Sequence, residues 1–144
     1  MKTREEIAEK VRLQAEAYAP TTFTYINPTT LKNSCTVCSA ALATLFEKEG
    51  YRSFIIVVDG TLNGHCFVYS DSQVYDITAT QFWSVPKVYT PLDFKRYMKE
   101  VINLCGDKTI IRHFPAKNLR AFKHFVDKWA ICPTPYNITK LLSC

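Results

Sequence analysis

A chain of 144 residues, 47% apolar and 22% charged, is long enough to bury a core and short enough to form one domain, so we expect a single domain over residues 1–144. No apolar run approaches the roughly 20 residues of a membrane span, and the charged N-terminus is unlike a secretory signal, so we expect a cytoplasmic protein with no membrane partner. The net charge of +5 is concentrated after residue 107, where Asp127 is the single acidic residue, and this imbalance indicates an anionic partner.

Two helices are predicted in the first third of the chain. Thr3 and Glu6 form a capping box, and the apolar periodicity behind them carries the first helix to about Pro20. A loop rich in threonine, proline and asparagine leads to a second helix over about 35–49. Gly50 closes this second helix.

Three strands are predicted next. A run of β-branched and aromatic residues over about 52–58 is too short for a helix and indicates a buried strand. Two further strands, at about 65–69 and 73–77, flank a tight polar connection and form a hairpin.

The last third of the chain carries weaker signals. Thr90 and Pro91 are typical of a helix cap and first helical position, which predicts a helix to about Leu104. A strand at about 109–114 and a final helix from about Lys117 complete the chain. The whole order predicts an α+β fold in which helices pack on a small antiparallel sheet.

Cys35 is the candidate nucleophile because the pattern places it at a helix start. Unpaired N–H groups and the helix dipole favour a thiolate there. Cys38 lies one turn further along an apolar face, where core packing is the expected role. In a chain of this kind we expect most of the six cysteines to be reduced thiols.

The C-x-x-C spacing of Cys35 and Cys38 leaves two alternatives open. A redox pair normally follows a strand directly, whereas a polar loop precedes Cys35. A zinc site would need His65 and Cys66 as further ligands, and adjacent residues of a strand point to opposite faces. Both alternatives fit their surroundings poorly, so we predict no metal site.

His65 and Asp76 are the candidate base and orienting carboxylate. A two-residue turn at either Ser70-Asp71 or Asp71-Ser72 places the two side chains on one face of the hairpin, because both registers preserve the alternation. The same alternation predicts that two apolar residues wall the site, Phe67 and Val74. A cysteine hydrolase needs this combination of nucleophile, base and orienting group.

Three sequence blocks resemble the transglutaminase-like branch of the papain-like cysteine hydrolase superfamily, which includes bacterial peptidases, deamidases and acyltransferases. The family's nucleophile is typically followed by a small residue, leucines along the helix and a glycine past its end. The matching residues here are Cys35, Ser39, Leu42, Leu45 and Gly50. The family's His-small-aromatic-Val strand is similar to residues 65–68, and its Asp-x-Thr-Ala segment is similar to residues 76–79 with the continuation 80–82.

The resemblance implies a papain-like core in which the nucleophile helix packs on a small antiparallel sheet. It divides the domain into an N-terminal helix and loop (1–34), a catalytic core (35–82) and a variable basic part (83–144). It implies amide hydrolysis or acyl transfer, as in a peptidase or glutamine deamidase, through Cys35, His65 and Asp76. A protein is the expected substrate and no cofactor is expected. Candidates for oxyanion or substrate binding are Asn27, Asn33 and Gln81.

The basic C-terminal part supports an alternative function. Basic residues recur there opposite an apolar stripe formed by Leu119, Phe122, Val126 and Trp129. The candidate face for an anionic partner is Lys117, Arg120, Lys123 and Lys128, with His124 among them. Amphipathic helices normally carry lysines outward, so a solvated surface is the simplest interpretation. The functional interpretation is an RNA-directed, toxin-like nuclease or an RNA-binding protein on a papain-like scaffold.

Overall fold

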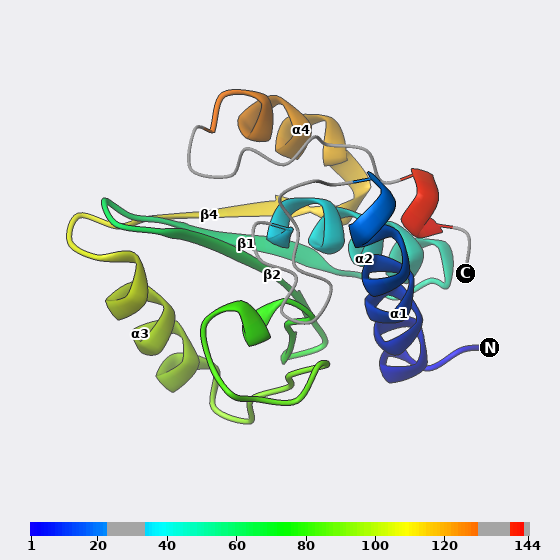
Figure 1. Ribbon diagram of the computed structural model, residues 1–144. Helices are drawn as coiled ribbons and strands as arrows, with labels where there is room; N and C mark the ends of the chain where they lie inside the picture. The colour runs from blue at the N-terminus through cyan, green and yellow to red at the C-terminus, as the bar shows by residue number, and fades with distance from the viewer. Residues whose placement is uncertain (23–33, 130–138, 143–144) are drawn as a thin grey trace.

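The computed structural model describes residues 1–22, 34–129 and 139–142, and within them the chain forms an α+β fold built on a four-stranded antiparallel sheet (Figure 1). The strand order across the sheet is β3-β2-β1-β4. The strands are β1 (Phe54–Asp59), β2 (Gly64–Ser70), β3 (Gln73–Tyr75) and β4 (Ile110–Pro115). The predicted fold class is confirmed at this level, with four α-helices around one small sheet in the described residues.

The turn between β2 and β3 decides the register of the hairpin. Asp71 and Ser72 have φ values of 51° and 61°, the left-handed conformation of both central residues in a type I′ turn. Tyr69 therefore pairs with Val74, one residue pair further from the turn than Ser70 and Gln73. Of the two registers considered from the sequence, the one with Asp71-Ser72 as the turn is correct.

One face of the sheet is covered by α1 (Arg4–Thr22), α2 (Cys35–Lys48) and α4 (Leu119–Asp127). Side chains at alternate strand positions, such as Val57, Cys66 and Val68, share a core with these helices. Residues around most of α2 are buried because this helix packs against both α1 and the sheet. Gly50, with φ of 89°, follows the end of α2 as the sequence predicts.

The other face of the sheet is covered by α3 (Phe94–Cys105), which Figure 1 shows on the opposite side from α4. Tyr97, Val101 and Cys105 are four residues apart, so they line one side of the helix and pack on the sheet. Their partners on the strands are Ile56, Val58, Phe67 and Val74.

The predicted start of α3 is wrong. The sequence prediction places the cap at Thr90 and the first helical residue at Pro91, but the helix starts at Phe94. Asp93 is the N-cap, and its side chain accepts a hydrogen bond from the backbone N–H of Arg96 at 3.1 Å. An aspartate with a donor three residues ahead is the stronger local cap, so the proline lies in the loop before the helix.

Two other helix boundaries differ from the prediction. Helix α1 continues past Pro20 to Thr22. Helix α4 begins at Leu119, after a short 3₁₀ turn at Ala116–Asn118 that contains the predicted start, Lys117. No helix among the described residues combines the length and hydrophobicity that crossing a membrane requires.

Candidate active site

Asp76 lies just beyond the end of β3 and is fixed by its backbone. The predicted strand to residue 77 is too long, because β3 ends at Tyr75. Asp76 instead forms an isolated antiparallel bridge with Tyr89, with N–H to carbonyl distances of 2.9 Å in both directions. This bridge holds the backbone of Asp76 while its side chain turns toward β2.

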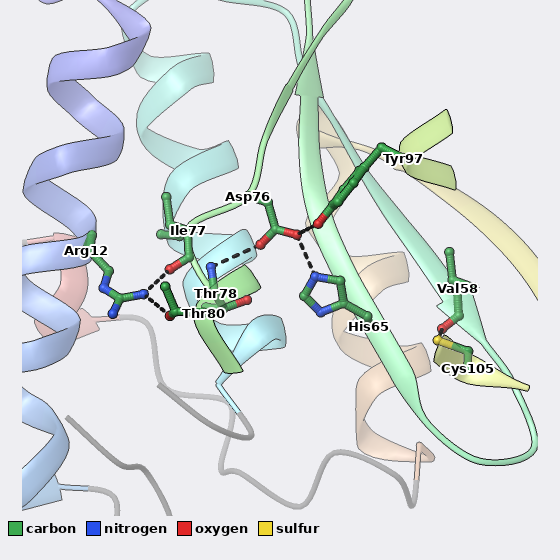
Figure 2. A network of polar contacts seen from close by, with 9 residues as sticks. All are labelled: Arg12, Val58, His65, Asp76, Ile77, Thr78, Thr80, Tyr97 and Cys105. Atoms are coloured by element: carbon green, nitrogen blue, oxygen red, sulfur yellow. Dashed lines mark hydrogen bonds and ion pairs between the residues drawn. The ribbon is translucent and has the colours of Figure 1, made fainter. Parts of the chain in front are cut away.

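The His65 imidazole and the Asp76 carboxylate form a fully buried pair (Figure 2). His65 is the second residue of β2, and its Nε2 lies 2.6 Å from Oδ2 of Asp76. Both residues have an exposed fraction of 0%. The hairpin alternation thus correctly placed the two side chains together. Nδ1 of His65 is also buried and has no hydrogen-bond partner among the described residues.

Two further donors hold the Asp76 carboxylate. The Tyr97 hydroxyl, from α3, donates to the same Oδ2 that contacts His65, and the backbone N–H of Thr78 donates to Oδ1 at 3.0 Å. Burial, together with the adjacent charge of Asp76, raises the pKa of Tyr97 above its usual range, so the hydroxyl stays protonated and acts as the donor. A carboxylate with this set of partners is compensated for the loss of water.

Aromatic rings fix the orientation of the His65 imidazole. The ring of Phe82 meets it edge-on, with centroids 5.0 Å apart and an interplanar angle of 88°. Phe67, two residues along β2, lies 6.0 Å away on the same face, which agrees with the predicted wall of the site. With Nε2 committed to Asp76, Nδ1 is the nitrogen through which His65 can accept a proton from a substrate or nucleophile.

A buried arginine ties the segment after Asp76 to α1. Arg12 is 1% exposed, and its guanidinium donates to the carbonyl of Ile77 and to Oγ1 of Thr80, both at 2.8 Å (Figure 2). Its Nε also pairs with Glu16 at 3.0 Å. The chain that leaves Asp76 is therefore anchored by charge-assisted hydrogen bonds.

Tyr97 and Arg12 are site residues that sequence reasoning missed. The spacing of Tyr97, Val101 and Cys105 contains a usable signal, since it places the tyrosine on the buried side of its helix. The spacing does not reveal that the hydroxyl of Tyr97 contacts Asp76. For Arg12 the sequence offers only an i,i+4 pairing with Glu16, which is typical of an exposed helix surface.

Cys35 is the first residue of α2, as predicted, and it is 3% exposed. The first N–H groups of a helix lack acceptors within the helix, and the Ser34 side chain does not cap them. Helix α2 packs against β2, the strand that carries His65. No hydrogen bond joins Cys35 to Nδ1 of His65 in the described residues. Cys38 is buried in the core, as the sequence predicts.

A different cysteine, Cys105, shares the sheet face of His65. Its thiol donates to the carbonyl of Val58, the residue paired with His65 on β1, at 3.6 Å. Burial, followed by the nearby charge of Asp59, raises the pKa of the Cys105 thiol to about 11. The Cys105 thiol is thus protonated at neutral pH and is a poor nucleophile.

Among the described residues no disulfide joins the cysteines, namely Cys35, Cys38, Cys66 and Cys105. Two more, Cys132 and Cys144, lie outside the described residues. Within the described part of the chain, no three histidine, cysteine, aspartate or glutamate side chains gather as metal ligands would.

The remaining predicted site residues fall in different places. Asn27 and Asn33 lie outside the described residues, and Gln81 ends the 3₁₀ turn that follows Asp76. The predicted basic face is exposed at all four positions, Lys117, Arg120, Lys123 and Lys128. Lys123 forms an ion pair of 2.9 Å with Asp127 on the same helix.

The chain matches no known protein family, no curated protein and no solved structure. The chemistry of the site therefore has to be inferred from its own geometry. A buried imidazole that a carboxylate orients at one nitrogen, and that has no hydrogen bond at the other within the described residues, has the geometry that general acid–base chemistry requires.

Proposed function

We propose that the protein is a cysteine-dependent hydrolase or acyltransferase that acts on amide bonds of a protein substrate, with Cys35 as nucleophile, His65 as base and Asp76 as orienting carboxylate. The observation that carries this proposal is the buried His65–Asp76 pair, in which Nδ1 of His65 has no hydrogen-bond partner among the residues that the structure describes. An unsatisfied buried nitrogen costs stability, and an active site is where such a cost is retained. A papain-like, transglutaminase-like core is part of the proposal.

In the proposed reaction, Nδ1 of His65 takes the proton of the Cys35 thiol and the sulfur attacks the acyl carbon. The imidazolium then donates this proton to the leaving amine, and a thioester remains on Cys35. Asp76 accepts the hydrogen bond from Nε2–H and stabilises the imidazolium while it exists. Water resolves the thioester in a peptidase or deamidase, and an amine resolves it in a transferase.

The position of Cys35 supports its role as the nucleophile. The helix dipole at the start of α2 favours negative charge on the sulfur, and a backbone N–H there can donate to the oxyanion that forms during attack. Catalytic hydrogen bonds are often long before substrate binds and shorten in the complex. In the proposed reaction, the Cys35 thiol therefore comes within hydrogen-bonding distance of Nδ1 of His65 when substrate is bound. Cys105, protonated and bonded to a carbonyl, does not meet these requirements.

Labelling with an iodoacetamide probe at about pH 6 tests the proposal, since an ordinary thiol is almost fully protonated at that pH. We expect the wild type and Cys38→Ser to be labelled, Cys35→Ser to lose labelling, and Asp76→Asn to be slowed by about 100-fold. Melting curves of all variants control for folding. Labelling that survives in Cys35→Ser and disappears in Cys38→Ser contradicts the assignment of the nucleophile.

The substrate class is tested in cells that express the wild type or Cys35→Ser. Mass spectrometry of host proteins is expected to show new peptide ends or glutamine-to-glutamate conversions with the wild type and not with the variant. The same modifications with both proteins would contradict a Cys35-dependent activity.

A further inference from the structure

Side chains of the edge strand β4 and of helix α4 line a groove. Helix α4 lies on the opposite side of the sheet from α3 (Figure 1). Its lining is both basic and aromatic. The main contributors are Arg112, His124 and Lys128 together with Phe114, Phe125 and Trp129. The groove lies outside the His65–Asp76 site and is made by different elements.

The aromatic side chains of the groove form a row of tilted rings. The centroids of Phe114 and Phe125 are 5.6 Å apart, and those of Phe125 and Trp129 are 5.1 Å apart, with interplanar angles of 33° and 39°. The guanidinium carbon of Arg112 lies over the ring of Phe125, the middle ring of the row, at 4.7 Å from its centroid, and adds a planar cationic group beside the rings. Nucleic-acid bases stack on both aromatic rings and arginine planes.

The floor of the groove is held by packing against β2. A Cβ atom placed on Gly64 would lie 2.1 Å from the Trp129 ring, so the indole occupies the space that a side chain would otherwise need. The indole N–H also donates to Asp59 at 3.0 Å. The aromatic row is therefore anchored before any ligand binds.

The charged and polar side chains of the groove complement the phosphates and sugars of a nucleic-acid backbone. Arg112, His124 and Lys128 supply cationic or hydrogen-bonding groups at its rim. Asp59 is the acidic group in this lining, and it accepts from Arg112 at 3.2 Å as well as from Trp129. An ionised carboxylate retains further acceptor sites, which repel a phosphate but suit a ribose 2′-hydroxyl.

We propose that the groove between β4 and α4 binds single-stranded RNA, with bases stacked along the Arg112–Phe125 row and phosphates near Lys128. Of the four residues of the basic face predicted from the sequence, only Lys128 lines the groove, so only Lys128 is part of the proposed RNA site. Lys117 lines a different hollow, beside Arg52 and Pro115. Binding here is independent of the proposed hydrolase chemistry.

Fluorescence anisotropy with a labelled RNA of about 12 nucleotides and mixed sequence tests the proposal on the full chain. Affinity is expected to fall steeply between about 50 and 200 mM KCl. Lys128→Glu should weaken binding about 10-fold and lower the salt slope by about 0.7, because one phosphate contact is lost. The matched control is Lys99→Glu, an equal charge change at an exposed position of α3, which should change affinity less than about 2-fold.

Stacking is tested with substitutions that keep the charge of the groove. Arg112→Lys retains the cation but not the planar group, and Phe125→Leu retains apolar volume; each should weaken RNA binding about 10-fold with an unchanged salt slope. DNA of the same sequence should bind more weakly, since it lacks the 2′-hydroxyl. Absent binding, equal losses in Lys99→Glu and Lys128→Glu, or equal affinity for DNA would overturn the proposal. Cys35→Ser should bind RNA with the affinity of the wild type. The RNA-binding proposal can therefore fail while the hydrolase proposal stands, and the reverse is also possible.

Discussion

The two faces of the sheet are built on different principles. The face under α1, α2 and α4 is an apolar core, whereas the face under α3 mixes apolar residues with the buried polar network of His65, Asp76 and Tyr97. Apolar packing tolerates changes in partner, but a buried carboxylate requires each donor in place. We infer that the first face mainly supplies stability, and that the second face holds the polar network on which the proposed chemistry depends.

This division has a consequence for the proposed nucleophile. Cys35 belongs to the core on the α2 face, whereas His65 shares the opposite face with Phe67. If Cys35 reacts, the site is assembled from both sides of the sheet, with the thiol supplied by α2 and the base by β2. The following predictions test how far the two faces are separate.

The largest effect is expected from Phe46→Ala, on the apolar face. Phe46 is 0% exposed and meets the ring of Tyr75 edge-on at 5.3 Å. Truncation leaves a cavity and should lower the free energy of unfolding by about 3–5 kcal/mol, measured by urea denaturation. Leu62→Ala is the control, since Leu62 is 74% exposed and its loss should cost less than about 0.5 kcal/mol. Similar costs for both variants would contradict the assignment of this face as the stabilising core.

The second prediction concerns the cysteine on the polar face. Because burial raises the pKa of Cys105 to about 11, its alkylation by iodoacetamide at about pH 8 should be roughly 100-fold slower in the folded protein than after unfolding in urea. Peptide mapping measures this ratio. Cys105→Ser should keep the labelling that depends on Cys35. Rapid labelling of Cys105 in the folded protein would instead place the reactive thiol on the same face as His65.

Tyr97→Phe is expected to have an intermediate effect. Removing the hydroxyl takes one donor from a buried carboxylate and should lower the free energy of unfolding by about 1.5–3 kcal/mol. It should also slow Cys35-dependent labelling, because Asp76 is held less firmly. Tyr89→Phe is the matched control, a tyrosine whose ring lies 5.5 Å from that of Tyr97. If both variants label at the wild-type rate, the hydroxyl does not position the proposed triad.

These contacts mark the limit of what the sequence could predict. Helix α2, the strands and the hairpin alternation follow from local signals, so the proximity of His65 and Asp76 was predictable. The Tyr97 contact depends on how α3 docks across the sheet, 21 residues after Asp76, and no local pattern encodes that docking. The predicted N-cap of α3 was wrong because two helix-start signals compete, Thr90-Pro91 and Asp93. Residue preferences at helix starts do not decide which of the two signals the chain uses.

The smallest effect is expected at Glu16, which is connected through Arg12 to the segment that follows Asp76. Burial acts to raise the pKa of Glu16, but hydrogen bonds and charge attraction from Lys87 and Arg12 outweigh it and lower the pKa below its usual range. A lowered pKa in the folded state adds stability above the unfolded pKa, and this stability is lost as pH falls through the folded pKa. Urea denaturation should thus show Glu16→Gln less stable than the wild type by less than about 1 kcal/mol at pH 6, with the difference vanishing as the pH falls through the folded pKa of Glu16.

The same variant shows whether the faces communicate. Arg12 donates a hydrogen bond to the carbonyl of Ile77, one residue after Asp76. Loss of the ion pair between Arg12 and Glu16 should therefore make Arg12 less rigid and disturb the position of Asp76 in the proposed triad. We expect Cys35-dependent labelling to slow modestly, by about 2-fold to 5-fold, in Glu16→Gln. Glu9→Gln, an exposed change on the same helix, should leave it unaltered. An unchanged rate in Glu16→Gln would mean that α1 stabilises the segment after Asp76 without tuning the chemistry, and the two faces would then be independent.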